Sequence, residues 1–84
     1  MATFTETRNL VGNFLADDFR SRNRADGFEY PLSLIYSETG AYPGIIGQDE
    51  VKTGIVQYLG RQGLEASLII RNRKSLFRVS KSKE

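Results

Sequence analysis

The chain contains no cysteine, no histidine and no tryptophan. Without cysteine it can form neither a disulfide framework nor a thiolate metal site. Without histidine it lacks the commonest general base, the usual partner of a serine nucleophile and the commonest zinc ligand. We therefore expect no enzymatic activity, no metal site and no cofactor. The absence of cysteine also fits a cytoplasmic protein.

Long hydrophobic stretches are missing as well. No run of apolar residues exceeds three, whereas a transmembrane helix needs about 20. The first ten residues, MATFTETRNL, also lack the basic and apolar regions of a signal peptide. We therefore expect no membrane contact. A chain of 84 residues predicts one domain, 1–84, with an ordered core at about 3–80 and a basic tail at 81–84.

Charge is unevenly distributed along the chain. The first 60 residues hold five basic and eight acidic side chains, a balance of −3, whereas residues 61–84 hold seven and two, a balance of +5. The overall net charge of +2 hides this segregation. Because such segregation usually concerns the surfaces through which a protein makes contacts, we expect the C-terminal third to meet a negatively charged partner.

Two segments have the spacing of amphipathic helices. In the first, Thr3 and Glu6 form a capping-box pattern, and the helix is expected to end before Asp26. Its apolar stripe consists of Leu10, Val11, Phe14, Leu15 and Phe19. The second helix begins at Gln48 or Asp49 and ends at Gly60 to Gly63, with Val51, Ile55, Val56 and Leu59 on its buried face. Gly54 in its middle costs about 1 kcal/mol relative to alanine, which indicates either close packing there or a weak helix.

The segment from Phe28 to Ser37 supports two interpretations. Every second residue from Phe28 to Tyr36 is aromatic or leucine, which predicts a strand, and Pro31 restricts that strand to an edge or to a strand start. Alternatively, Pro31 begins a short helix over Leu32 to Thr39 that Gly40 ends. We predict the strand. The following segment, 40–47, is rich in glycine and is expected to be a loop.

The C-terminal run predicts a β-hairpin. With Asn72 and Arg73 as a two-residue turn, one face pairs Leu68 with Phe77, Ala66 with Val79 and Ile70 with Ser75. The other face pairs Ser67 with Arg78, Glu65 with Ser80 and Ile69 with Leu76. A four-residue loop would keep the same parity, so the turn type stays open. The predicted fold is α+β, in the order helix, strand, helix, hairpin, with a three-stranded antiparallel sheet whose helices lie on one face.

Basic side chains gather around this hairpin and favour a non-enzymatic module that binds nucleic acid, either DNA or RNA. Each phosphate that a cation neutralises releases counterions and adds affinity. The expected contacts are Arg71, Arg73, Lys74 and Arg78, supported by Lys52 and Arg61. A second basic cluster, Arg20 to Arg24, would join them if the first helix ended beside the hairpin. The alternative for all these charges is a solvated surface that keeps a small protein soluble.

A second hypothesis is a protein-binding adaptor or inhibitor, of the kind a mobile element directs at a host complex. Its anchors would be Tyr36, Tyr42 and an exposed pair formed by Ile69 and Leu76, because tyrosine and apolar side chains dominate binding energy at interfaces. The basic rim would steer this surface toward an acidic protein. A homodimer is a further possibility for so small a domain.

Residues Asp49 to Val79 resemble the C-terminal half of a winged-helix DNA-binding domain. In that family a recognition helix with a glycine-marked end is followed by a two-stranded wing, which here correspond to EVKTGIVQYLGRQGL and EASLIIRNRKSLFRVS. The resemblance implies that Arg71, Arg73 and Lys74 contact the backbone or minor groove, and that the major groove is faced by Lys52, Thr53, Gln57 and Arg61. A winged helix also needs a helix before the recognition helix, so it requires the helical alternative for Leu32 to Thr39.

Overall fold

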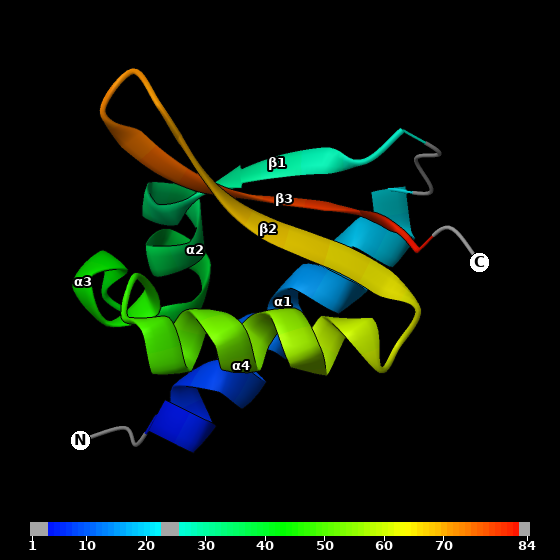
Figure 1. The fold of residues 1–84 in the computed structure, drawn as a ribbon, viewed down its shortest axis with the longest axis horizontal. Coiled ribbons are helices and arrows are strands. Elements are labelled where there is room, and N and C mark those ends of the chain that lie inside the picture. Colours follow the sequence, from blue (N-terminus) through cyan, green and yellow to red (C-terminus); the bar gives the residue numbers. More distant parts are fainter. Residues whose placement is uncertain (1–3, 23–25, 83–84) are drawn as a thin grey trace.

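The computed structural model describes residues 4–22 and 26–82 and has an α+β fold. The strands form one layer, with helices beneath them (Figure 1). The elements are α1 (Phe4–Arg22), β1 (Phe28–Pro31), α2 (Leu32–Thr39), α3 (Pro43–Ile46), α4 (Asp49–Gly60), β2 (Leu64–Arg71) and β3 (Lys74–Lys81). The predicted fold class is therefore confirmed. The predicted N-cap, Thr3, lies outside the described residues.

The three strands form an antiparallel sheet in the order β1-β3-β2, so the last strand of the chain is the central one. All six predicted cross-strand pairs of the hairpin are present, from Glu65 opposite Ser80 to Ile70 opposite Ser75. Alternation along both strands made this register predictable, because a slip by one residue would turn every apolar side chain to the wrong face. Strand β1 pairs with the edge of β3 that faces away from β2, with Tyr30 opposite Phe77.

The ambiguous segment contains both a strand and a helix. The strand prediction holds for Phe28–Pro31 and is wrong for the residues after Pro31, where the helical alternative, Leu32–Thr39, is right. Pro31 ends an edge strand, where no neighbour needs its missing N–H group, and its fixed φ leads directly into the helix. Gly40 ends α2 in the left-handed conformation, with φ of 79°, and its N–H group donates to the Tyr36 carbonyl at 2.8 Å. The predicted loop over 40–47 includes the short helix α3.

The core lies between the inner face of the sheet and the helices. Its completely buried side chains include Tyr30, Phe77 and Val79 from the strands and Leu15, Ile55 and Leu59 from α1 and α4. The predicted buried face of α4 is confirmed for Val51, Ile55 and Leu59, and Val56 is partly buried. On α1 the predicted apolar stripe is confirmed for Val11, Leu15 and Phe19, which are buried. Phe14 is partly buried, and Leu10 is 47% exposed.

Two glycines allow α1 and α4 to cross closely. A Cβ atom on Gly12 would lie 2.4 Å from the Tyr58 ring, and one on Gly54 would lie 2.8 Å from the Arg8 side chain. The Tyr58 hydroxyl also donates a hydrogen bond to the Asn13 side chain across the same crossing. Gly54 therefore belongs to a site of close helix packing, which offsets its low helix propensity.

Asp18 connects α1 to the first strand. Its carboxylate accepts hydrogen bonds from the Tyr30 hydroxyl at 2.7 Å and from the Arg22 guanidinium at 2.6 Å. The same guanidinium lies 4.0 Å from the centre of the Phe28 ring, within cation–π distance. Burial, strengthened by the hydrogen bond to Asp18 and its charge, raises the pKa of Tyr30 well above its usual value of 10. These contacts fix the start of β1 against the end of the helix.

Candidate nucleic-acid interface

The tip of the hairpin is a tight two-residue turn. Asn72 and Arg73 have φ of 53° and 62°, and positive values at both central positions define a type I′ turn. This turn matches the twist of the flanking strands, so it holds the tip in one orientation. Arg73 and Lys74 are exposed, and within residues 4–22 and 26–82 neither side chain forms an ion pair. We call these two residues the tip cations.

Two other predicted contacts, Arg71 and Arg78, lie on the outer face of the sheet and are occupied. The Arg71 guanidinium donates two parallel hydrogen bonds to the Glu29 carboxylate, at 2.9 and 3.0 Å. Arg78 lies 3.7 Å from the same carboxylate and donates to the main-chain carbonyl of Asp26 at 2.7 Å. We call Arg71 and Arg78 the face cations. Glu29 neutralises part of their charge, so they are less available to a phosphate than the tip cations.

The predicted exposed pair, Ile69 and Leu76, is not an exposed pair. Leu76 is only 8% exposed and Ile69 is partly buried, so the expectation of an apolar anchor here is wrong for Leu76. The sheet register gives the reason. Leu76 lies between Ile69 and Pro31 in one cross-strand row, whereas Arg71 and Glu29 lie on opposite sides of that row. The Arg71 side chain must therefore cross the row at Leu76 to reach Glu29, and its methylene groups shield the leucine.

The remaining predicted contacts belong to α4. Lys52 is partly buried and lies 3.5 Å from Asp49, one turn earlier. Thr53 and Gln57 are exposed on the same helix, so they are accessible to a ligand. Because β2 runs back from the end of α4, the start of this helix and the hairpin tip lie at the same end of the molecule (Figure 1). That end also contains Asp49 and Glu50, which would repel phosphate.

Arg61 lies at the opposite end of the molecule. It follows the last turn of α4, and an eight-residue strand spanning about 25 Å separates it from the tip. Arg20 is at that end too, because its guanidinium donates to the Gln62 side chain at 3.0 Å. Lys81 lies nearby, since Arg20, Gln62 and Lys81 all line a cavity of about 400 Å³. Within the second basic cluster Arg22 is bound by Asp18, and Arg24 lies outside the described residues. Arg73 and Lys74 therefore lie at one end of the sheet, whereas Arg20, Arg61 and Lys81 lie at the other.

The two tyrosines expected at a protein interface are exposed, by 43% for Tyr36 and 61% for Tyr42. Although six residues apart, their rings stack on each other with centroids 5.2 Å apart and an interplanar angle of 26°. The turn between α2 and α3 brings them together. Sequence reasoning selected both residues but gave no sign of the stacking.

Glu29 is the residue of the candidate site that sequence reasoning missed. It lies 42 positions from Arg71 in the sequence, and no local sequence pattern indicates that its strand, β1, pairs with β3.

Among residues 4–22 and 26–82, no three histidine, cysteine, aspartate or glutamate side chains come close enough to hold a metal ion. No helix of the same residues is long and apolar enough to cross a membrane. No family model matches the chain, and no curated protein or solved structure is significantly similar to it.

Proposed function

We propose that this chain is a small, non-enzymatic, cytoplasmic module that binds nucleic acid through the tip of its β2–β3 hairpin. The observation that carries the proposal is the state of the tip cations. Arg73 lies in the two-residue turn and Lys74 directly after it; both are exposed and have no ion-pair partner among the described residues. Cations in this state gain most from phosphate contact, because no internal partner must be released first.

The arrangement around the tip supports a winged-helix mode of binding. Helix α1, strand β1 and helices α2 and α3 precede α4, and the hairpin follows it, with the strand order β1-β3-β2. In this mode α4 is the recognition helix and the hairpin is the wing. Thr53 and Gln57 would then face the bases, and the tip cations would hold the backbone.

The charge distribution predicts that the wing supplies most of the affinity. Asp49 and Glu50 at the start of α4 oppose phosphate contact there, and Lys52 is already paired with Asp49. The face cations are held by Glu29, and Arg61 lies at the other end of the sheet. We therefore expect about two phosphate contacts per chain, which means weak binding with a shallow dependence on salt.

Fluorescence anisotropy of labelled duplex DNA, single-stranded DNA and RNA, titrated at about 50 and 200 mM salt, tests the proposal. We expect the double variant Arg73→Ala/Lys74→Ala to lose about 100-fold in affinity at the lower salt. The matched control is Arg61→Ala/Lys81→Ala, which removes the same charge at the far end and should bind almost like the native chain. Binding to none of the three probes at low salt, or equal losses in the two variants, would contradict the proposal. The preferred probe identifies the class of nucleic acid.

A second candidate function, a protein-binding adaptor or inhibitor, is favoured by the stacked tyrosines. Tyr36 and Tyr42 present a rigid aromatic surface of the kind that anchors protein interfaces. The tip cations at the same end of the molecule would steer this surface toward an acidic partner. In the anisotropy titration, absence of binding to every probe would favour this candidate. Loss of partner binding in a Tyr42→Ala variant would then support it.

A further inference from the structure

Within residues 4–22 and 26–82, the outer edge of β2 has no partner strand. In the order β1-β3-β2, this strand pairs with β3 on one side only. A two-residue turn makes Arg71 and Lys74 a hydrogen-bonded pair, so the alternate residues of β2 direct their N–H and C=O groups away from β3. The bond from the Ser82 N–H group to the Gly63 carbonyl, at 2.9 Å, fits this alternation. The outward-directed residues are Leu64, Ala66, Leu68 and Ile70.

This edge lacks most of the usual protection against pairing with another strand. The opposite edge, β1, is four residues long and ends in proline, whereas β2 has eight residues and no proline. Within residues 64–70 the only charged side chain is Glu65. Near the tip, Ile70 is 73% exposed, the highest value among the exposed large hydrophobic residues of the described chain. A long open edge with an exposed isoleucine is suited to strand addition.

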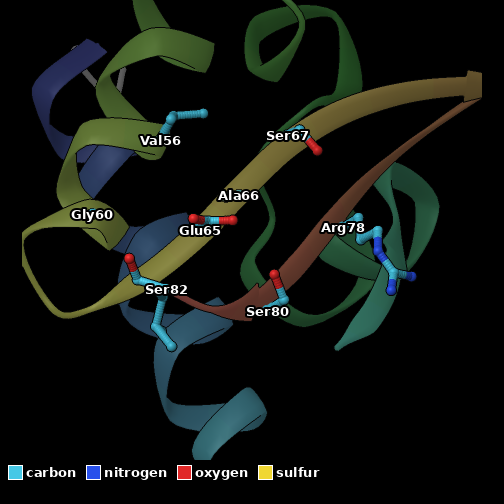
Figure 2. A pocket seen from close by; sticks show the side chains of 9 residues that line it. Val56, Gly60, Glu65, Ala66, Ser67, Arg78, Ser80 and Ser82 are labelled. Atoms are coloured by element: carbon cyan, nitrogen blue, oxygen red, sulfur yellow. The ribbon is translucent and has the colours of Figure 1, made fainter. Parts of the chain in front are cut away.

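A groove of about 450 Å³ runs beside this edge. Figure 2 shows Val56 and Gly60 of α4 on one side of it, with Ala66 and Ser67 on β2. Leu64 lines it as well. The groove therefore offers an apolar wall, formed by Val56, Leu64 and Ala66, next to unpaired main-chain groups of the strand. The rest of its lining is mostly polar and includes Glu65, Ser67, Arg78, Ser80 and Ser82.

From these features we infer that the chain forms a two-fold symmetric dimer in which β2 pairs antiparallel with β2 of a second copy, with Leu68 opposite Leu68. Outward-directed residues must face one another in such a ladder, and this register satisfies that condition. The two sheets join into one of six strands. The contact is isologous, so each feature of one copy meets its complement on the other.

Apolar complementarity favours a second copy of the chain as the partner of this edge. In the proposed register Ala66 lies opposite Ile70 of the second copy, and directly opposite residues share a face of the sheet. Ile70 of the second copy is thereby placed beside Val56, on the apolar wall of the groove. The dimer buries the exposed isoleucine of each copy in the groove of the other, which happens twice by symmetry.

Charge complementarity fixes the register. Glu65 lies opposite Arg71 of the second copy, and opposite charges at such positions are stabilising. Sliding the ladder by one allowed step in one direction places Glu65 opposite Ile69, and sliding it in the other places Arg71 opposite Ser67. Because Glu29 lies on β1, on the far side of β3, Arg71 must leave Glu29 and turn toward the outer edge of β2 to pair with Glu65 of the second copy. This inference is independent of nucleic-acid binding.

Sedimentation equilibrium from about 10 μM to about 1 mM tests the dimer by mass action. We expect the mean mass to rise toward twice that of the monomer, and the variant Ile70→Lys to dissociate at least tenfold more readily. Glu65→Lys should weaken the dimer in the same direction. The matched control Leu10→Lys replaces another exposed apolar residue, on α1, and should leave the dimer intact. A monomer across the whole range, or a dimer that Ile70→Lys does not weaken, would overturn the inference.

The absence of cysteine allows a clean test of the register. A nitroxide on a cysteine at position 67 would lie about 7–8 Å, measured between backbones, from its counterpart in the second copy. We expect strong dipolar broadening there, and loss of the broadening in the Ile70→Lys background. A label at position 37, exposed on α2, is the control and should remain sharp. A sharp spectrum at position 67 in a sample that sediments as a dimer would exclude this register.

Discussion

The basic side chains of the hairpin fall into two groups that are adjacent in sequence and different in state. The tip cations, Arg73 and Lys74, are exposed and unpaired within the described residues, whereas the face cations, Arg71 and Arg78, are held by Glu29 and the carbonyl of Asp26. The first group is available to a ligand. The second covers the outer face of the sheet and connects its two edges. Net charge along a segment therefore overstates the charge that a partner can use.

The largest expected effect concerns the leucine beneath the face cations. Leu76→Ala should lower the free energy of unfolding by about 2–3 kcal/mol, because the side chain is 8% exposed and its removal leaves a cavity. Ile70→Ala, at a position 73% exposed, is the matched control and should change it by less than about 0.5 kcal/mol. Urea denaturation at low protein concentration measures both. Equal losses would show that the arginines do not shield Leu76.

The second prediction removes the difference between the two groups of cations, because it releases the face cations from Glu29. Glu29→Gln should lower the free energy of unfolding by about 1–2 kcal/mol, because it removes a bidentate ion pair and the second arginine contact. It should also raise the affinity for nucleic acid, since Arg71 and Arg78 become available. Glu38→Gln, at an exposed position on α2, should change neither quantity. Greater stability in Glu29→Gln, or unchanged affinity, would contradict the assignment.

The third prediction concerns the helical side of the sheet, where the Asp18 carboxylate accepts hydrogen bonds from Tyr30 and Arg22, as Glu29 does from Arg71 on the outer face. Tyr30→Phe should cost about 1 kcal/mol near pH 7 through the lost hydrogen bond. The raised pKa of Tyr30 means that the folded state keeps a proton that the unfolded chain releases near pH 10. The native chain therefore loses up to about 1.4 kcal/mol per pH unit above pH 10 from this group.

The Tyr30→Phe variant should lack that part of the alkaline loss. Chemical denaturation between about pH 8 and pH 11 provides the measurement. Tyr36→Phe, at an exposed tyrosine, is the control and should retain the slope of the native chain. The same slope in the Tyr30→Phe variant would show that Tyr30 ionises normally in the folded state.

The smallest effect separates the geometry of a face cation from its charge. Arg71→Lys keeps the charge but loses the paired hydrogen bonds to Glu29, so it should cost about 0.5–1 kcal/mol. Its affinity for nucleic acid should stay within about twofold of the native value. Arg73→Lys, at the tip, should have no measurable effect on stability. A destabilisation of Arg73→Lys as large as that of Arg71→Lys would remove the distinction between the groups.

The sequence predicted those parts of the fold that local periodicity determines. Alternation along the hairpin specified all six predicted pairs, and helical spacing identified α1 and α4. The segment after Phe28 was harder, because Pro31 suits both the end of an edge strand and the start of a helix. The structure uses the proline for both purposes at once.

The state of the candidate site depended on contacts between distant residues and could not be predicted in the same way. No local pattern indicates that β1 adds to the far side of β3, yet this pairing brings Glu29 to Arg71 and Arg78. The burial of Leu76 follows from the same contact. Sequence reasoning therefore selected the basic residues of the hairpin but could not divide them into available and occupied ones.

The division between tip and face cations is tested most directly by the dependence of nucleic-acid affinity on salt. The measurement compares the slope of log K against log salt concentration for the native chain, Arg73→Ala/Lys74→Ala and Arg71→Ala/Arg78→Ala, each verified as folded by circular dichroism. The account predicts that the tip variant flattens the slope by about 2 and that the face variant leaves it almost unchanged while losing stability. A face variant that flattens the slope as much as the tip variant would contradict it.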